Sequence, residues 1–128
     1  MKVVEVVAGV ITDCHGHVFC VQRGENPKTY ISKKWEFPGG KLEADESHEQ
    51  ALIRELKEEL SIEVGSLEFF LTVDHRYPDF RLIMHAYKCK IVLGSPVLTE
   101  HLESKWLNVA DLDELDWSAA DIPIVKKL

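Results

Sequence analysis

Residues 40–62 read GKLEADESHEQALIRELKEELSI, and they carry the clearest structural signal in the chain. Between Ser47 and Leu60 there is no glycine or proline, so nothing in this part of the stretch interrupts a helix. Apolar side chains recur there at helical spacing, at Leu52, Ile53, Leu56 and Leu60. The pattern predicts an amphipathic helix over residues 47–60.

Three glutamates of this helix share one face. Glu55, Glu58 and Glu59 stand at positions i, i+3 and i+4, where like charges destabilise a helix by about 0.2–0.5 kcal/mol per pair. The apolar face around Leu56 lies about a third of a turn away, so the acids sit beside the core boundary. Clustered hard oxygen ligands suit Mg²⁺ or Mn²⁺, with water and substrate phosphates completing the coordination. An ordinary solvated helix face is the alternative interpretation.

The run Trp35–Gly40 precedes the helix and predicts a short strand that ends at a proline and two glycines. Glycine lets backbone groups approach a metal–phosphate group closely, because it has no side chain. This context favours a functional role for the glutamates over the solvated-face interpretation.

The spacing across residues 40–62 resembles the Nudix box. Five residues lead from Gly40 to Glu46, seven more lead to Arg54–Leu56, and Lys57 precedes Glu58–Glu59. The pattern spans 23 positions and fixes a glycine, four glutamates, an arginine and two aliphatic residues, so a chance match is very improbable. One position departs from it: Ser61 stands where the family usually has glycine, at an expected helix end that serine can fill at modest cost.

This resemblance implies an α/β fold, a mixed β-sheet sandwiched between α-helices, in a single domain over residues 1–128. With 128 residues and 45% hydrophobic side chains, the chain has enough apolar material for one core. Along the chain, the predicted elements are strands at 3–12 and 17–22 forming an opening hairpin, a surface loop at 24–34, strands at 67–73, 81–93 and 105–107, and a terminal helix at 122–128 with Ser118 or Asp121 as its N-cap.

The resemblance also implies roles for the residues of the box. Glu55, Glu58 and Glu59 would bind Mg²⁺, with Glu58 and Glu59 nearest to catalytic necessity. The other roles follow the same match: the Gly39 carbonyl would add a ligand, Arg54 would orient Glu55, and Glu46 would brace Arg54 through an ion pair.

Glu100 lies before Trp106 at a spacing similar to that of an additional metal ligand or base in MutT-like members of the family. No strict motif surrounds it, so a plain surface acid is an equal alternative. Bound metal ions would neutralise the charge of the phosphate chain, activate water and stabilise the leaving phosphate.

Several features resemble the MutT-like branch, which hydrolyses (deoxy)nucleoside triphosphates to monophosphate and pyrophosphate: the small size, residues 35–41 and residues 119–123. In that branch the residue matching Asp121 often touches the base. An ionised Asp121 would accept a hydrogen bond from the exocyclic amine of cytosine, whereas a protonated one would also donate and admit oxidised guanine, as in 8-oxo-dGTP. Arg23 would lie near the nucleotide and Phe37 would wall the base pocket. The alternatives are a solvated strand-end charge and a plain core residue.

The net charge of −7 argues against long nucleic acid as a partner and leaves a small nucleotide. No apolar run is long enough for a membrane span, and an early acid interrupts the start, so a cytoplasmic protein is expected. Cys14, Cys20 and Cys89 are expected to be reduced structural thiols. The six histidines lack a paired metal-binding spacing, and three of them, His75, His85 and His101, are expected to be structural or exposed.

Other readings of the chain are a Nudix hydrolase of different nucleoside diphosphate derivatives, a non-catalytic nucleotide-binding Nudix module, and a hydrolase of capped RNA. The binding module would have no need of four repelling box glutamates, and the acidic charge disfavours RNA. A monomer and a homodimer both remain open, because the strand around Val3–Val10 is predicted to form an edge or a dimer contact.

Overall fold

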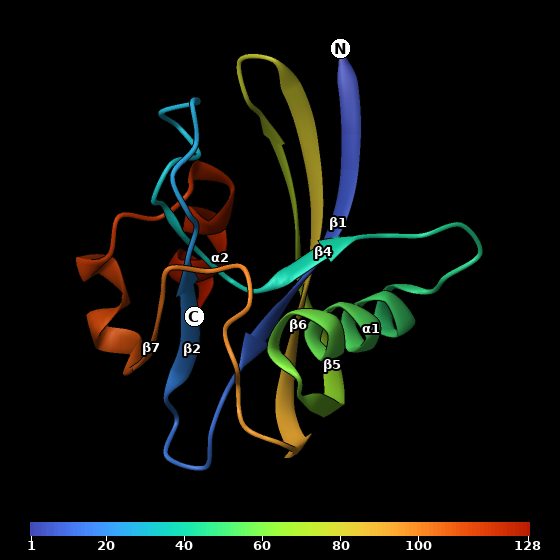
Figure 1. Ribbon diagram of the computed structural model, residues 1–128, viewed down its shortest axis with the longest axis vertical. Helices are drawn as coiled ribbons and strands as arrows, with labels where there is room; N and C mark the ends of the chain where they lie inside the picture. Colours follow the sequence, from blue (N-terminus) through green and yellow to red (C-terminus); the bar gives the residue numbers. More distant parts are fainter.

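The computed structural model describes residues 1–128, whose strands form two sheets (Figure 1). The first has the order β4-β1-β6-β5 and is mixed, because β1 and β6 are parallel and the other neighbours antiparallel. The second, β3-β2-β7, is antiparallel. The strands are β1 (Lys2–Ile11), β2 (Val18–Gln22), β3 (Trp35–Glu36), β4 (Gly39–Lys41), β5 (Glu63–Arg76), β6 (Phe80–Leu93) and β7 (Glu103–Leu107).

Helices α1 (His48–Leu60) and α2 (Ile122–Lys127) lie on opposite sides of the first sheet (Figure 1). Alternation along β1 divides the core between these sides: Val7 and Ile11 pack with Leu56 of α1, whereas Ala8 and Val10 pack on the other side. Two short 3₁₀ segments, Val109–Glu114 and Ala119–Asp121, complete that second side. The predicted α/β class with a mixed sheet between helices is confirmed. No helix is long and apolar enough to span a membrane.

Helix α1 begins and ends as its sequence predicts. The Ser47 side chain accepts a hydrogen bond from the Gln50 backbone amide, and the Gln50 side chain accepts one from Ser47, which completes a capping box. Ser61 is the C-cap in a left-handed conformation with φ 58°. Glycine adopts this conformation most easily, which explains why the Nudix box usually has glycine at this position. Ser61 takes the same conformation at a modest cost.

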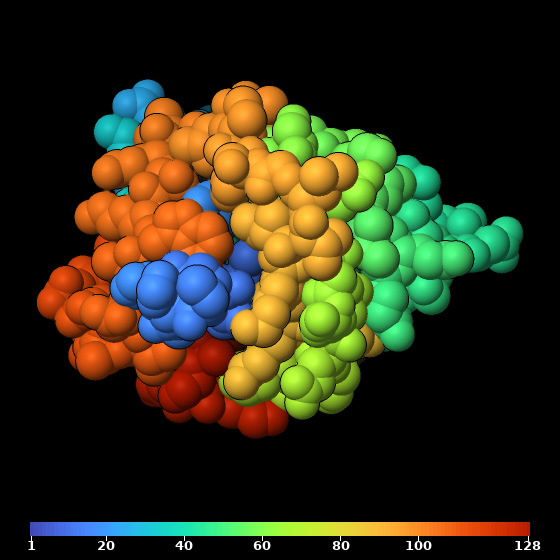
Figure 2. Space-filling model, turned by 90° about the horizontal axis from the view of Figure 1, so that it is seen from below, coloured from blue at the N-terminus to red at the C-terminus, as the bar shows by residue number.

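The predicted opening hairpin is wrong. Only one bridge, between Thr12 and Val18, joins the two strands before they enter different sheets. Figure 2, which views the molecule from below, shows the turn between them as a blue protrusion. Cys14 is exposed in this turn, so the structural role predicted for it is also wrong, whereas Cys20 and Cys89 are buried.

Strand β1 is not an edge strand, contrary to one prediction for it, because β6 pairs along its whole length and β4 pairs with Val6–Ala8 on the other side. Asp121 occupies the N-cap position of the terminal helix α2, as one of the two predictions had it, and Ser118 occupies that of the 3₁₀ segment before it. Neither residue makes a side-chain capping bond there. The Ser118 side chain instead contacts Tyr77, and the Asp121 side chain accepts a hydrogen bond from the Phe37 amide.

Candidate active site

A cavity of about 740 Å³ lies between the two sheets and the C-terminal half of α1. Seven of the residues predicted for the site line it, from five separate parts of the chain: Arg23, Phe37, Gly39, Glu55, Glu59, Glu100 and Asp121. Three predicted residues, Glu46, Arg54 and Glu58, lie outside its lining. The fold therefore gathers Glu55 and Glu59 of α1 and the suggested base-recognition residues around one space.

The two glycines of β4 allow close contacts on two sides. A Cβ atom at Gly40 would lie 2.3 Å from the carboxylate of Glu55 on α1, and one at Gly39 would lie 1.9 Å from the backbone oxygen of Val7 on β1. Real Cβ atoms do not make such contacts, so a side chain at residue 40 would displace the Glu55 carboxylate and one at residue 39 would push β4 away from β1. Gly40 therefore lets the Glu55 carboxylate lie directly against the β4 backbone.

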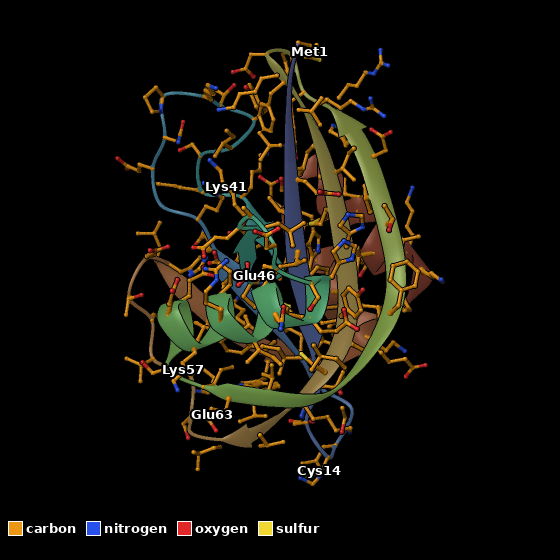
Figure 3. All side chains as sticks on the ribbon, turned by 90° about the vertical axis from the view of Figure 1, so that its right-hand side faces the viewer. Met1, Cys14, Lys41, Glu46, Lys57 and Glu63 are labelled. Carbon is orange, nitrogen blue, oxygen red and sulfur yellow. The ribbon has the colours of Figure 1, made fainter.

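Arg54 links the loop before α1 to the acids of the helix. Its Nε and Nη2 donate to the two carboxylate oxygens of Glu46, at 2.7 and 2.9 Å, in a bidentate pair. Nη2 also donates to the Lys41 carbonyl at 3.0 Å, and Nη1 donates to Glu55 at 3.0 Å and Glu58 at 3.3 Å. Figure 3 labels Lys41 and Glu46 on this side of α1. Hydrogen bonding to Arg54 lowers the pKa of Glu46.

Glu59 is the buried acid of the cluster, with 8% of the residue exposed. Burial first, and then the charges of Glu55, Glu36 and Glu100, raise its pKa to about 8. Its Oε2 is buried with no hydrogen-bond partner. A carboxylate oxygen left in this way is costly, and a bound cation would satisfy it. The oxygen-only donor set around it fits a divalent metal ion.

Glu55 lines the cavity beside Glu59, and burial raises its pKa while the hydrogen bond from Arg54 opposes that shift. Glu58 differs, because 61% of its side chain is exposed and its carboxylate contacts Arg54. Glu100 is exposed on the loop before β7 and lines the same cavity. Both lie within reach of the cluster without being buried in it.

Sequence reasoning missed two residues of this cluster. Glu36 lines the cavity and contacts Arg23 at 3.4 Å. The side chain of His101 is only 5% exposed, and its Nε2 lies 3.2 Å from Glu36 and 3.7 Å from Glu59. The sequence predicts a structural or exposed His101, and it does not predict that this residue lies among the acids of the site. The alternation in Trp35-Glu36-Phe37 was a usable signal for Glu36, whereas the position of His101 depends on a loop packing against β3.

Asp121 lines the same cavity from the 3₁₀ segment Ala119–Asp121. It is 4% exposed, and its Oδ1 accepts a hydrogen bond from the Phe37 amide at 3.0 Å. Burial raises the pKa of Asp121 well above its usual range. Phe37 is both core and cavity wall, and it stacks on Trp117 with the ring centroids 4.8 Å apart. Beside them, the Ser118 hydroxyl bonds to Tyr77 at 2.8 Å instead of capping a helix.

Comparison with known proteins agrees with this architecture. The family model described as NUDIX domain matches residues 2–128. An 8-oxo-dGTP diphosphatase of Proteus vulgaris is 49% identical over 78 residues, which cover 61% of this chain and 68% of the relative. A CTP pyrophosphohydrolase of Escherichia coli is 33% identical, covering 98% of this chain and 91% of the relative. The crystal structure of a MutT Nudix hydrolase from Burkholderia pseudomallei shares the fold, with a TM-score of 0.88, 22% identity and coverage of 100% and 99% of the two chains. The chain belongs to the Nudix family.

Proposed function

We propose that the chain hydrolyses nucleoside triphosphates at the linkage between the inner two phosphates, giving nucleoside monophosphate and pyrophosphate. The observation that carries this proposal is a single cavity lined both by the Glu55–Glu59 carboxylate pair and by Asp121 with Phe37. The carboxylate pair fits cation-bound phosphates, and Asp121 with Phe37 fits a base. The names of the two relatives, a diphosphatase and a pyrophosphohydrolase of nucleoside triphosphates, support the same reaction.

Hydrolases of this family generally need a divalent metal ion. We assign it here to Mg²⁺, with Mn²⁺ as a substitute, because the donors are oxygens. Glu55, Glu59 and the Gly39 carbonyl would hold it, with Glu58 and Glu100 reaching in from the exposed side. When bound, the ion would offset phosphate charge and make water a better nucleophile. No nucleophilic side chain is required, and none is assigned.

The remaining residues of the box act by positioning. Arg54 fixes the Glu55 carboxylate through its contact at 3.0 Å, and Glu46 fixes Arg54 through the bidentate pair. A side chain held at two points loses little freedom when substrate binds. His101 and Glu36 support the buried Glu59 from the side of β3.

Base selection is assigned to Asp121, Phe37 and Arg23. Burial raises the pKa of Asp121 well above its usual range, which favours the protonated form. In that form Asp121 would donate a hydrogen bond as well as accept one, and the donated bond would admit oxidised guanine, as in 8-oxo-dGTP. Arg23, with 48% of its side chain exposed at the cavity, would contact the nucleotide.

Cytosine nucleotides remain the second candidate. The relative named CTP pyrophosphohydrolase supports them, because it aligns with 98% of this chain. Binding of the cytosine amine needs only an acceptor, and a carbonyl oxygen of neutral Asp121 supplies one. The two candidates differ in whether Asp121 must donate.

A product-resolved panel assay tests the proposal. Purified protein would be incubated with Mg²⁺ and with natural and oxidised nucleoside triphosphates, CTP and 8-oxo-dGTP included. We expect monophosphate plus pyrophosphate, with 8-oxo-dGTP preferred, and a loss of about 100-fold or more in Glu59→Gln. Glu68→Gln is the matched control, because Glu68 is an exposed glutamate on β5 outside the cavity.

Release of phosphate plus diphosphate would contradict the assigned linkage. Turnover confined to other nucleoside diphosphate derivatives would replace the substrate class and keep the family chemistry. Binding of nucleotides without any turnover would point to a non-catalytic module.

A further inference from the structure

Three side chains far apart in the sequence meet on the face of the first sheet that α1 covers. Glu5 lies on β1, His48 is the first residue of α1, and His85 lies on β6. One ligand atom from each lies within 4.8 Å of the other two. None of the three lines the cavity of the candidate active site. The cluster is therefore a separate feature of the molecule.

Nδ1 of each imidazole ring has a hydroxyl partner. Nδ1 of His85 lies 2.9 Å from the Thr72 hydroxyl, and Nδ1 of His48 lies 3.2 Å from the Tyr87 hydroxyl. Nε2 of His85 lies 2.7 Å from the Glu5 carboxylate. A hydrogen bond to one ring nitrogen fixes the tautomer and orientation in which the other binds a metal.

We propose that Glu5, His48 and His85 form a site for a divalent transition ion of the Zn²⁺ class. Two imidazole nitrogens and one carboxylate oxygen match the ligands of such ions, with a fourth position left for water. Mg²⁺ prefers oxygen ligands and would stay with the glutamates of the active site. The inference is independent of the proposed function, because it uses no residue of the catalytic cluster.

Entry of an ion needs two of the three side chains to move. Tetrahedral coordination at ordinary Zn–N and Zn–O lengths places ligand atoms about 3.3 Å apart. The Glu5 carboxylate therefore has to withdraw slightly from His85, and its side chain is 50% exposed and free to do so. The His85 side chain is only 11% exposed, and its ring stacks on that of His48 with the centroids 4.0 Å apart. Because a metal ion binds in the plane of an imidazole ring, the half-buried His48 has to turn its ring out of this stack to share an ion with His85. The exposed carboxylate provides the entry side.

An ion at this site would join the first turn of α1 to β1 and β6. The ligands come together only in the folded chain, so binding would stabilise the folded state by mass action. The expected effect is a rise in thermal stability that Mg²⁺ alone does not produce.

Calorimetric titration with Zn²⁺ in excess Mg²⁺ tests the proposal, since Mg²⁺ occupies the oxygen site. Wild-type protein should bind one Zn²⁺, and His48→Ala and Glu5→Gln should each weaken binding by about tenfold or more. His75→Ala and His17→Ala are controls that each remove a histidine outside the cluster, and they should leave the affinity unchanged. Thermal melts without Zn²⁺ would verify that every variant is folded, and Glu5→Gln changes an exposed carboxylate with little risk to folding.

Unchanged Zn²⁺ affinity in both folded variants would overturn the proposal. Loss of binding in His17→Ala instead would place the ion in the turn where His17 contacts Asp13 at 2.8 Å. Loss in Glu59→Gln would place it among the catalytic acids. Either result would also overturn the assignment, and neither depends on whether the protein turns over nucleotides.

Discussion

Gly40 makes room for the side chain of Glu55, because glycine has no side chain of its own. The Glu55 carboxylate occupies the space that a Cβ at residue 40 would need, and Arg54 holds it there from the other side. Next to it, Glu59 is kept from water, and one of its oxygens has no partner. The free energy stored in these contacts is released when a cation binds, because the buried charge is then compensated.

Gly40→Ala should lower kcat/KM by about tenfold or more, because the added methyl displaces the Glu55 carboxylate by a fraction of an ångström or more. Steady-state kinetics on the preferred nucleotide would measure the change. Gly24→Ala is the matched control, since it adds the same methyl at the rim of the same cavity with nothing within 4 Å. Equal effects from the two substitutions would show that the Gly40–Glu55 contact has no special importance.

Asp121→Asn should keep kcat/KM on 8-oxo-dGTP within about threefold at neutral pH, because a neutral carboxyl and an amide both donate and accept hydrogen bonds. Asp121→Ala should lose about tenfold or more, since the Phe37 amide and the base would lose a partner. The comparison of kcat/KM for the two variants measures this difference. A loss in Asp121→Asn as large as in Asp121→Ala would mean that the ionised carboxylate is the working form.

At the scale of elements, α1 combines three tasks in 13 residues. Its apolar side anchors it to the first sheet, its acidic side faces β4 and the cavity, and its first residue meets β1 and β6 through His48. The helix ends in the left-handed Ser61, after which the chain enters β5.

Ser61→Gly should raise the free energy of unfolding by about 0.5–1 kcal/mol, because glycine adopts the left-handed conformation without the steric cost of a Cβ. Urea denaturation would measure the gain, and the activity should stay unchanged. Ser61→Val, whose branched side chain tolerates this conformation poorly, should instead destabilise the protein. A gain with valine would contradict the strained-cap interpretation.

The helix, its end at Ser61 and the shared face of its three glutamates could be predicted because spacing within 23 residues decides them. The two sheets could not be separated from sequence, since Thr12–Val18 resembles any short hairpin until β1 pairs with β6. Glu36 and His101 were missed for the same reason, because only tertiary packing brings them next to the acids of α1. It also explains His48 and His85, which are 37 positions apart and stack in the fold.

At the scale of the whole molecule, the fold places two buried acids, Glu59 and Asp121, in the lining of one cavity of a chain of net charge −7. The charge repels polyanions, and a cation is needed before phosphates can bind beside the glutamates. Folding therefore brings together carboxyls that resist ionisation, so stability and metal binding are linked.

Without divalent ions, the free energy of unfolding should fall as the pH rises from about 5 to about 8. In this window the folded chain keeps the Glu59 proton, whose pKa is about 8, while the unfolded chain releases it near the ordinary value of 4.5, so ionisation favours unfolding. The expected loss is on the order of 2–4 kcal/mol, and Asp121 acts in the same direction.

Urea titrations across this pH range would measure the slope, which Mg²⁺ should flatten by partnering the ionised carboxylate. Glu59→Gln should reduce the slope without Mg²⁺. A slope of the opposite sign, or one unaffected by Glu59→Gln, would contradict the assignment of a buried, protonated acid.

The most direct test is the initial rate of pyrophosphate release from 8-oxo-dGTP as a function of Mg²⁺, in wild type, Glu59→Gln and Glu68→Gln. We predict a rate that depends on Mg²⁺ in the wild type, is unchanged in Glu68→Gln, and falls by about 100-fold or more in Glu59→Gln. Equal rates in wild type and Glu59→Gln, or pyrophosphate release that persists after chelation of all divalent ions, would contradict the central role of the buried glutamate cluster.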